Sequence, residues 1–406
     1  MCSWGQLDGE QSNLGDIVIF ESMVATLRAI DPHVDIVAFS GDPAESSRRY
    51  GVRAYDVFHP SGAAAFMREL VTADLVLLGG GELVQDRSSK AYLVANLAPG
   101  LLAAASRRPF MAYAVGVSGP EETSPVGRRL AGRILGWAQA VTVRDEASAA
   151  HLARYGVDPA MIRVTADCAF QIDPASNGVW QGPVERAGLS PERPFALFAV
   201  RAFGHRRGGL LPAALRKRIG LSSGIGAIQS RSRLARDLAG IIDWTVTKLG
   251  LQVLLLPAQQ KGRMALDDRD FCDEVASRCG VSSGVGTLRS RLPTGDLIAV
   301  MRHASFLLGT PLHSLILATM AHLPMVGLCY ASKVERYLAR IGMEDYALDL
   351  FRDPEATLPR NSVMNRIQAL LARREDIARS LERRHGEMSL RAAENEVVLR
   401  RLLEAR

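Results

Sequence analysis

A histidine placed just after an apolar run is the residue of this sequence best suited to acid–base chemistry. The segment SFLLGTPLHSLILA predicts a buried strand that ends at Gly309, then a helix with Thr310 as its N-cap and Pro311 as its first residue. His313 then lies in the first helical turn, where unpaired backbone N–H groups attract phosphate or carboxylate. The helix dipole there favours a neutral imidazole, which suits proton transfer. The alternative interpretation is a buried structural histidine bonded to a carbonyl.

An arginine is expected at the same edge of the sheet. Arg201 ends the run FALFAVR, which predicts a strand over 195–201. Ligands of parallel α/β sheets bind outside the carboxyl ends of the strands, so Arg201 and His313 are expected on one rim. A guanidinium there can hold a carboxylate or phosphate through two hydrogen bonds. The sequence leaves open whether the two side chains face each other.

Glycines and acidic residues follow an apolar run in the first half of the chain. Gly79, Gly80 and Gly81 come directly after LVLL and lead to Glu82 and Asp86. Adjacent glycines let a backbone approach a ligand closely and present its N–H groups. A tight turn chosen for packing explains them as well.

Three further polar positions allow two interpretations each. Asp16, in the motif NLGD, is either the cap of a helix predicted over Gly15–Ile30 or a group that binds or deprotonates an acceptor hydroxyl. Arg144 ends the strand TVRD and Asp167 follows IRVTA. A buried salt bridge or a helix cap explains these two residues as well as ligand binding does.

These residues must be positioned by alternating strands and helices. β-branched runs predict strands, and segments of helical periodicity lie between them, which is the pattern of a doubly wound parallel sheet. In the first half we predict strands over 35–40, 74–81, 109–118, 140–145 and 162–167, and helices over 61–73, 90–107, 125–139 and 146–156. In the second half we predict strands over 195–201, 252–258, 304–310 and 324–330, and helices over 233–249, 267–279 and 311–322.

The sequence therefore predicts an α/β protein with two Rossmann-like doubly wound domains that face each other across a cleft. A stretch rich in Pro, Gly and Ser separates them, and the chain ends in an Arg/Glu/Leu-rich helix expected to cross back over the first domain. The predicted boundaries are 1–175 for the first domain, 176–194 for the linker, 195–350 for the second domain and 351–406 for the helical tail.

Composition limits the classes of function. The 406 residues are 48% hydrophobic and 23% charged, with no apolar run of membrane-spanning length and no secretory signal. The five cysteines form no metal-ligand pair, so we expect a cytoplasmic protein without a metal site. The net charge of +6 is concentrated in 206–236, which is either a solvated loop or a flap that draws in an anionic substrate. Since no aromatic residues interleave with these charges, nucleic acid is not an expected partner.

Six motifs occur in an order that resembles the polysaccharide pyruvyl transferase family, from about Asn13 to Gly342. They are NLGD, LGGGELVQDRSS, AVGVSGP, TVRDEAS, TADCAF and GTPLHSLILA followed by YASKVE. The resemblance implies a two-domain fold like that of the GT-B glycosyltransferases. It also implies transfer of the enolpyruvyl unit of phosphoenolpyruvate to sugar hydroxyls as a ketal, as in exopolysaccharide biosynthesis. No cofactor is implied, and phosphoenolpyruvate is a co-substrate.

By this resemblance the first domain binds the acceptor and the second binds the anionic donor. The acceptor would be a sugar, a lipid-linked sugar or another hydroxyl compound, and the protein is a possible homo-oligomer. The residues expected to act in catalysis are His313, Arg201 and Asp16. Those expected to bind the donor are Thr310, Leu312, Ser314, Gln259 and Lys333. Those expected to bind the acceptor are Asn13, Gly15, Gly80, Gly81, Glu82, Asp86 and Arg144.

The sequence departs from the family pattern at two positions. Pro311 stands where the family has an arginine, and Ala331 stands where an aspartate follows the tyrosine. Losing the arginine removes a charged contact to the donor, for which Arg302, Arg201 or the basic 206–236 stretch is expected to compensate. Two alternatives follow: a GT-B-type transferase with a nucleotide-linked donor, for which Glu335 is the candidate ribose ligand, and a non-catalytic relative that kept the fold.

Overall fold

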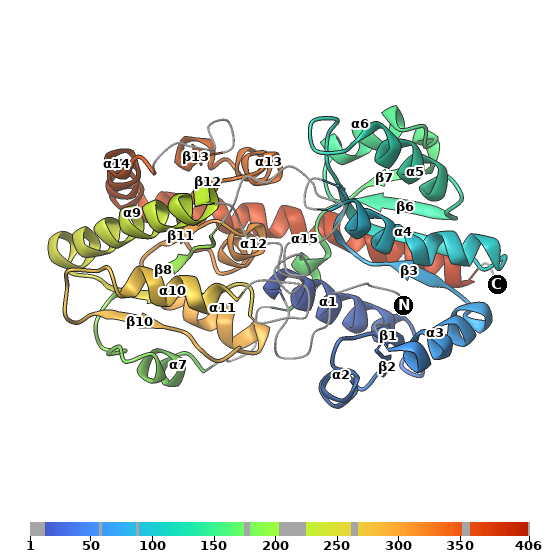
Figure 1. The fold of residues 1–406 in the computed structure, drawn as a ribbon, viewed down its shortest axis with the longest axis horizontal. Coiled ribbons are helices and arrows are strands. Elements are labelled where there is room, and N and C mark those ends of the chain that lie inside the picture. The colour runs from blue at the N-terminus through green and yellow to red at the C-terminus, as the bar shows by residue number, and fades with distance from the viewer. Residues whose placement is uncertain are drawn as a thin grey trace.

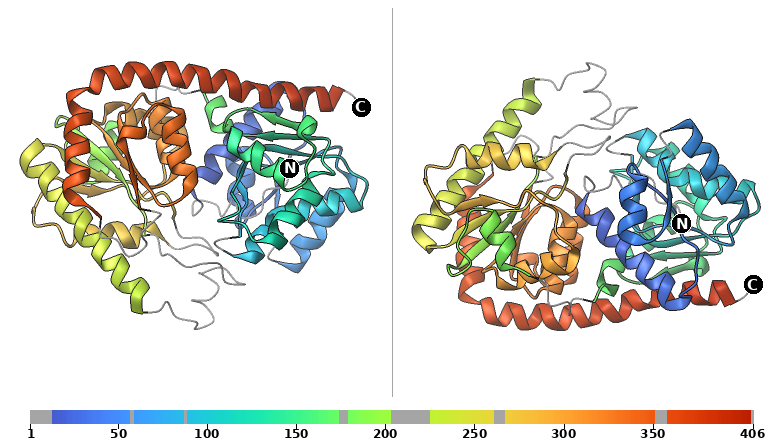
Figure 2. Two further views of the ribbon diagram at one scale, coloured as in Figure 1. Left: turned by 90° about the horizontal axis from the view of Figure 1, so that it is seen from above. Right: turned by 90° about the horizontal axis from the view of Figure 1, so that it is seen from below.

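Two α/β lobes lie side by side in the computed structural model, and one long helix runs along both (Figure 1; Figure 2). The structure describes residues 13–56, 59–86, 89–173, 179–202, 225–260, 267–350 and 358–404. Most of the predicted basic stretch 206–236 lies outside these residues. The two-domain α/β fold predicted from the sequence is confirmed.

The second lobe is built on six parallel strands in the order β10-β9-β8-β11-β12-β13. The bounds are Phe195–Ala199 for β8, Gln252–Leu255 for β9, Val285–Thr287 for β10, Leu307–Gly309 for β11, Met325–Cys329 for β12 and Ala347–Asp349 for β13. The chain order reverses between β8 and β11, which pair from Leu197↔Leu307 to Ala199↔Gly309. A crevice at such a reversal is the usual ligand site of a doubly wound sheet. Strands β10 and β13 were not predicted.

The first lobe contains a parallel sheet in the order β3-β5-β6-β7, with β4 also paired to β5. A separate two-stranded parallel sheet lies beside it. The bounds are Val37–Phe39 for β1, Arg53–Tyr55 for β2, Val76–Leu78 for β3, Gly81–Val84 for β4, Phe110–Val117 for β5, Ala140–Val143 for β6 and Ile162–Val164 for β7. Strands β3 and β4 lie along successive parts of β5. The glycine run therefore interrupts a strand, where the sequence predicted only its end.

Helices connect the strands of both sheets. In the first lobe they are α1 (Leu14–Ile30), α2 (Pro43–Tyr50), α3 (Pro60–Thr72), α4 (Lys90–Ala105), α5 (Pro125–Leu135) and α6 (Glu146–Arg154), with the short turns η2 (Pro159–Met161) and η3 (Cys168–Gln171). In the second they are α7 (Gln181–Arg186), α9 (Ile225–Leu249), α10 (Asp268–Ala276), α11 (Thr294–His303), α12 (Leu312–Met320), α13 (Ser332–Arg340), η4 (Glu344–Tyr346) and α14 (Arg360–Ala372).

The caps of two helices differ from those considered in the sequence analysis. Helix α1 begins at Leu14, within the NLGD motif as predicted, and its cap is Asn13, whose side chain accepts from the backbone N–H of Gly15; of the two interpretations of Asp16, the cap is therefore excluded. Helix α12 begins at Leu312 with Pro311 in the N-cap position. The Thr310 hydroxyl is buried and, among the described residues, has no hydrogen-bond partner, so it is not the predicted cap.

Helix α15 (Arg374–Glu404) crosses from the second lobe to the first, as predicted, and packs on α12 and η3 (Figure 2). Its Met388 and Ala392 belong to the core of the second lobe, whereas Leu399 packs with α1 and β5. The fully buried Asn395 accepts from the Thr165 hydroxyl at 2.8 Å and donates to the Ala166 carbonyl at 3.1 Å. Of the helices described, none is long and apolar enough to cross a membrane.

Replacing Asn395 by leucine should lower the free energy of unfolding by about 1–3 kcal/mol, because it removes the hydrogen bonds that the buried Asn395 amide makes with the Thr165 hydroxyl and the Ala166 carbonyl. Urea denaturation followed by circular dichroism measures the change. Glu394→Gln is the matched control, because its ion pair with Arg163 is solvent-exposed and should contribute little. Equal midpoints for both variants would contradict the assigned role of Asn395.

Candidate functional site

The start of α1, in the first lobe, docks directly on the second lobe. The backbone N–H of Leu14 donates to the carbonyl of Ala258 at 2.8 Å, and Asn13 and Gln259 form an isolated antiparallel bridge. Asn13 was predicted to bind the acceptor and Gln259 the donor. The structure brings the two residues together at the boundary between the lobes.

His313 rests on the backbone of Gly15. A Cβ atom built on Gly15 would lie 2.1 Å from His313 Nδ1, so no larger residue fits between the imidazole and α1. The side chain of His313 is only 15% exposed. The glycine of the NLGD motif therefore leaves room for the ring of a histidine that lies almost 300 residues away in the chain.

The outer nitrogen of the same imidazole faces an ionised carboxylate of the first lobe. His313 Nε2 lies 3.6 Å from Asp167 Oδ2, and Arg144 Nη1 donates to that oxygen at 3.3 Å. The other oxygen of Asp167 accepts from the backbone of Ala169. Burial by itself would raise the pKa of Asp167, but His313 and Arg144 outweigh it and lower the pKa to about 2.

Arg144 is held by a second glycine that the sequence analysis did not assign to the site. A Cβ on Gly116, near the carboxyl end of β5, would lie 2.6–2.8 Å from Nη2 and Nε of Arg144, so the guanidinium lies over the Gly116 backbone. The signal was present in the sequence, because a glycine inside a buried strand often marks a close approach. The Arg144 guanidinium also lies 3.8 Å from Asp145.

Arg201 lies on the rim of the sheet, as predicted. Its partner is Asp268, the first residue of α10, which follows β9 in the chain. Nε of Arg201 is 3.5 Å from Oδ1 of Asp268, while Oδ2 of Asp268 accepts from the backbone of Gln259 at 2.8 Å. Burial raises the pKa of Asp268 to about 6, although Arg201 opposes the shift. Asp268, which the sequence analysis did not select, thus joins Arg201 to Gln259 at the ends of β8 and β9.

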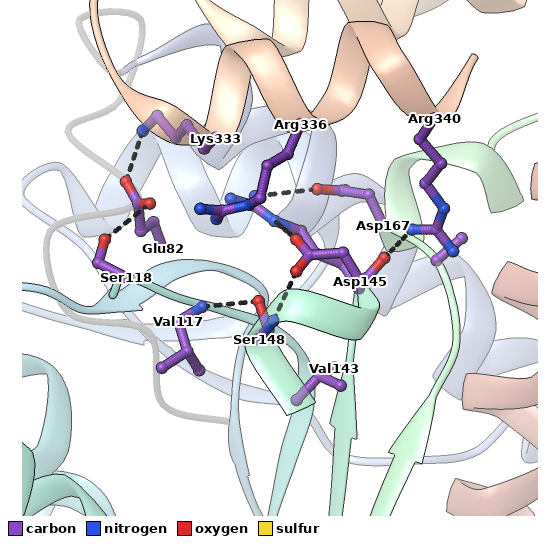
Figure 3. Close-up of polar contacts among 12 residues, drawn as sticks. Glu82, Val117, Ser118, Val143, Asp145, Ser148, Asp167, Lys333, Arg336 and Arg340 are labelled. Atoms are coloured by element: carbon purple, nitrogen blue, oxygen red, sulfur yellow. Dashed lines mark hydrogen bonds and ion pairs between the residues drawn. The ribbon is translucent and has the colours of Figure 1, made fainter. Parts of the chain in front are cut away.

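A buried ion pair closes the boundary between the lobes at α13. Lys333 Nζ donates to Glu82 Oε2 at 2.7 Å, and the Ser118 hydroxyl donates to Oε1 of the same carboxylate at 2.9 Å (Figure 3). Lys333 was predicted to bind the donor and Glu82 the acceptor. In this conformation each is the partner of the other.

Lys333 also lines a small cavity between the lobes, enclosing about 30 Å³. Asp167 and Arg144 form part of its wall, so the cavity adjoins the contact with His313. The other lining residues come from the end of β6, from α12, α13 and α15, and from the segment after β7: Asp145, Ala166, Phe170, Leu312, Ile316, Arg336, Tyr337, Arg340 and Met388.

Several predicted ligand residues have structural partners instead. Both carboxylate oxygens of Asp86 accept from Ser124, at its backbone and at its hydroxyl. Gly80 packs against Ile19 and Cys168, and Gly81 has a φ of 93°, which favours glycine. These contacts give Asp86, Gly80 and Gly81 a structural role, and their predicted role in binding the acceptor stays a prediction.

The remaining predicted residues lie around the start of α12 and the start of α1. The Ser314 hydroxyl donates to the Pro311 carbonyl at 2.6 Å, so it is engaged within its own turn. Asp16, at the start of α1, lies near Tyr92 on α4. Arg302 lies at the far end of α11, near His322 and His385, and so does not replace the missing family arginine.

The sequence matches the family model for polysaccharide pyruvyl transferase over residues 13–332. A comparison with curated proteins finds no match.

Solved structures share the fold at low sequence identity. HepE from Anabaena in complex with UDP and glucose is 13% identical, with a TM-score of 0.60 over 100% of this chain and 99% of that one. The MnaA–UDP structure from S. aureus is 13% identical, with a TM-score of 0.60 over 98% and 94%. UDP-GlcNAc 2-epimerase from Neisseria meningitidis, bound to UDP-GlcNAc, is 10% identical, with a TM-score of 0.59 over 100% and 99%. At these identities the likeness shows the fold alone, and that fold is GT-B-like.

Replacing Gly15 by alanine should destabilise the protein by about 1–3 kcal/mol, because the new methyl group must displace the His313 ring or shift α1. Thermal or urea denaturation measures the effect. Gly386→Ala is the matched control, because a Cβ at this helical glycine meets open space, and alanine should raise stability by about 0.5–1 kcal/mol. A stabilised Gly15→Ala variant would contradict the close contact.

The stability that Asp167 contributes should depend on pH in the acid range. Its pKa is lowered from an ordinary value of 3.8 to about 2 by folding, so its contribution is present above pH 4 and is lost as the pH falls through about 2. The difference in unfolding free energy between the wild type and Asp167→Asn should therefore shrink by about 1 kcal/mol from pH 6 to pH 3. Urea denaturation of both proteins at each pH tests this, and a constant difference would contradict it.

Proposed function

Because the chain belongs to the polysaccharide pyruvyl transferase family, we propose that it transfers the enolpyruvyl unit of phosphoenolpyruvate to two hydroxyls of a sugar or polymer precursor. The product is a pyruvate ketal, and inorganic phosphate is released. The observation that carries the proposal is the setting of His313. This buried histidine has, among the described residues, no hydrogen-bond partner for Nε2, and it lies between a glycine and an ionised carboxylate.

The reaction needs one acid and a way to remove two protons. A proton delivered to the methylene carbon of phosphoenolpyruvate leaves an electrophilic carbon, to which one acceptor oxygen bonds. The second acceptor oxygen then bonds to the same carbon as the bond to the phosphate oxygen breaks. Of the two hydroxyl protons released, one restores the acid and the other leaves with the phosphate as HPO₄²⁻. The methylene carbon of phosphoenolpyruvate becomes the methyl group of the ketal, so atoms and charges balance.

His313 is the residue we assign to this proton transfer. The ionised Asp167 attracts the positive charge that the imidazole carries when protonated, and Arg144 in turn holds Asp167 in place. A positioned acid of this kind contributes on the order of 10²–10⁴-fold to the rate. In this scheme Arg144 and Asp167 position the histidine, and Arg201 attracts the anionic donor from the adjoining strand end.

The acceptor is proposed to enter on the side of α1 and α4. Asp16 at the start of α1 and Tyr92 at the start of α4 lie near each other, and 40% of the Tyr92 side chain is exposed. An exposed aromatic ring beside a carboxylate suits a sugar, which offers both apolar faces and hydroxyl groups.

A nucleotide-linked donor is the competing function, because HepE and MnaA with the same fold were solved with UDP. The proposed ribose ligand of that alternative, Glu335, is exposed on α13. A thermal-shift titration with phosphoenolpyruvate and with UDP separates the two. Stabilisation by phosphoenolpyruvate supports the proposed donor, whereas stabilisation by UDP alone favours a glycosyl transferase. No response to either supports a non-catalytic relative.

Replacing His313 by glutamine should reduce pyruvyl transfer by at least about 100-fold, because the amide cannot deliver a proton to carbon. Release of phosphate from phosphoenolpyruvate, in the presence of acceptor glycans, measures the rate. The stabilisation by phosphoenolpyruvate should survive in this variant, which separates chemistry from binding. His33→Gln, at an exposed loop, is the control and should match the wild type. Unchanged turnover in His313→Gln would remove the histidine from the mechanism.

A further inference from the structure

Helix α13 presents a basic face to the first lobe. Its Lys333, Arg336 and Arg340 project toward the carboxyl ends of the first-lobe strands, where Glu82, Asp145 and Asp167 lie (Figure 3). Together with Arg144 these three cations line the cavity between the lobes. The cavity is therefore walled by four cationic side chains from two lobes, together with the carboxylates of Asp145 and Asp167.

Several N–H groups of the guanidinium side chains in this wall have no hydrogen-bond acceptor among the described residues. Four buried N–H positions have no hydrogen-bond acceptor within the part of the chain that the structure describes: Nε and Nη2 of Arg336, Nε of Arg340 and Nη2 of Arg144. The Arg144 side chain is 6% exposed. Buried donors are almost always satisfied in folded proteins, so four unsatisfied donors around one cavity indicate an absent acceptor.

Three of the four cations have their charge neutralised by protein groups. Arg144 faces Asp167 and Asp145. Lys333 binds Glu82, and Arg340 lies 3.8 Å from Glu146 and donates to the carbonyls of Arg144 and Thr165.

Arg336 differs from its neighbours. Its Nη1 donates to the Ser332 hydroxyl at 3.0 Å, but no carboxylate among the described residues pairs with it. Its charge also acts on His151, whose pKa is lowered first by burial and then by Arg336. The Ser332 hydroxyl in turn donates to Glu122 at 3.1 Å, so a carboxylate is linked to Arg336 through this hydroxyl. A half-buried guanidinium without a direct carboxylate partner beside a cavity is costly unless an anion binds there.

We propose that this cavity is the site of the donor's phosphate group, held by Arg336 with Arg340 and Arg144. The inference rests on the proposed function for the identity of the donor, but the site itself is defined by the unsatisfied donors. Arg336 then supplies the charged contact that Pro311 removes from the start of α12. Because Arg144 belongs to the first lobe and Arg336 to the second, the bound phosphate also holds the lobes together.

The arrangement suits a phosphate better than a carboxylate. A carboxylate is planar and is satisfied by a single guanidinium fork, whereas a phosphate offers three terminal oxygens in different directions. Here the donors without acceptors belong to three separate arginines, one directly after β6 and two on α13.

Isothermal titration calorimetry with inorganic phosphate tests the site without any turnover. The wild type should bind phosphate, and Arg336→Gln should raise its Kd by at least about tenfold, because a charge-assisted contact is lost. Arg336→Lys should bind phosphate more tightly than Arg336→Gln and less tightly than the wild type. Lysine keeps the positive charge but lacks the paired N–H donors of the guanidinium. Arg129→Gln, an exposed arginine on α5, is the matched control and should bind as the wild type does.

A parallel titration with pyruvate identifies the group that the site recognises. Pyruvate carries the donor's carboxylate without its phosphate, so its affinity should be the same in wild type and Arg336→Gln. An Arg336→Gln variant that loses pyruvate but keeps phosphate would overturn the assignment, and so would unchanged phosphate affinity in both Arg336→Gln and Arg340→Gln.

The two proposals fail in different ways. If phosphate binding depends on Arg336 but phosphoenolpyruvate is not turned over, the site stands and the pyruvyl transfer is wrong. If phosphoenolpyruvate is turned over while Arg336→Gln leaves its KM and the phosphate affinity unchanged, the transfer stands and the phosphate lies elsewhere. Folding of each variant is checked by its melting temperature, and a destabilised Arg336→Gln is replaced in the comparison by Arg336→Met.

Discussion

The contact on which the site depends is the packing of the His313 ring on the backbone of Gly15. It joins the first turn of α12, in one lobe, to the first turn of α1, in the other. The backbone hydrogen bond from Leu14 to Ala258 fixes the same junction. Because the ring is clamped there, its free nitrogen can only face Asp167, a residue of the first lobe. The histidine and its partners form one unit only when both lobes are in contact.

Charged groups at this junction are buried, which is costly unless each has a partner. The space that they occupy is created by glycines, with Gly15 under the imidazole and Gly116 under the Arg144 guanidinium. A side chain at either position would force the charged group outward into water. Burial in turn strengthens the attraction between Arg144 and Asp167, because the surrounding dielectric is low. The two glycines therefore affect the electrostatics of the site, because they allow His313 and Arg144 to lie close to the backbone and away from water.

Helix α15 keeps the two lobes at this distance. It belongs to the core of both lobes, and the Asn395 amide binds the segment that leads into Asp167. That segment joins β7 to η3, so the position of the carboxylate is tied to the crossing helix. The ion pair of Lys333 with Glu82 is a second polar contact between the lobes. Polar contacts thus fix how the two lobes meet.

The sequence by itself determined the strand and helix alternation, the two-domain fold and the position of His313 at the start of a helix. These follow from local periodicity and from residues such as Gly309 and Pro311 that end or begin elements. Only the tertiary structure decided that Gly15 supports His313, that Arg201 pairs with Asp268, and that Arg336 lines a cavity. Such contacts join residues far apart in the chain, and no local pattern encodes which helix start will meet which strand end.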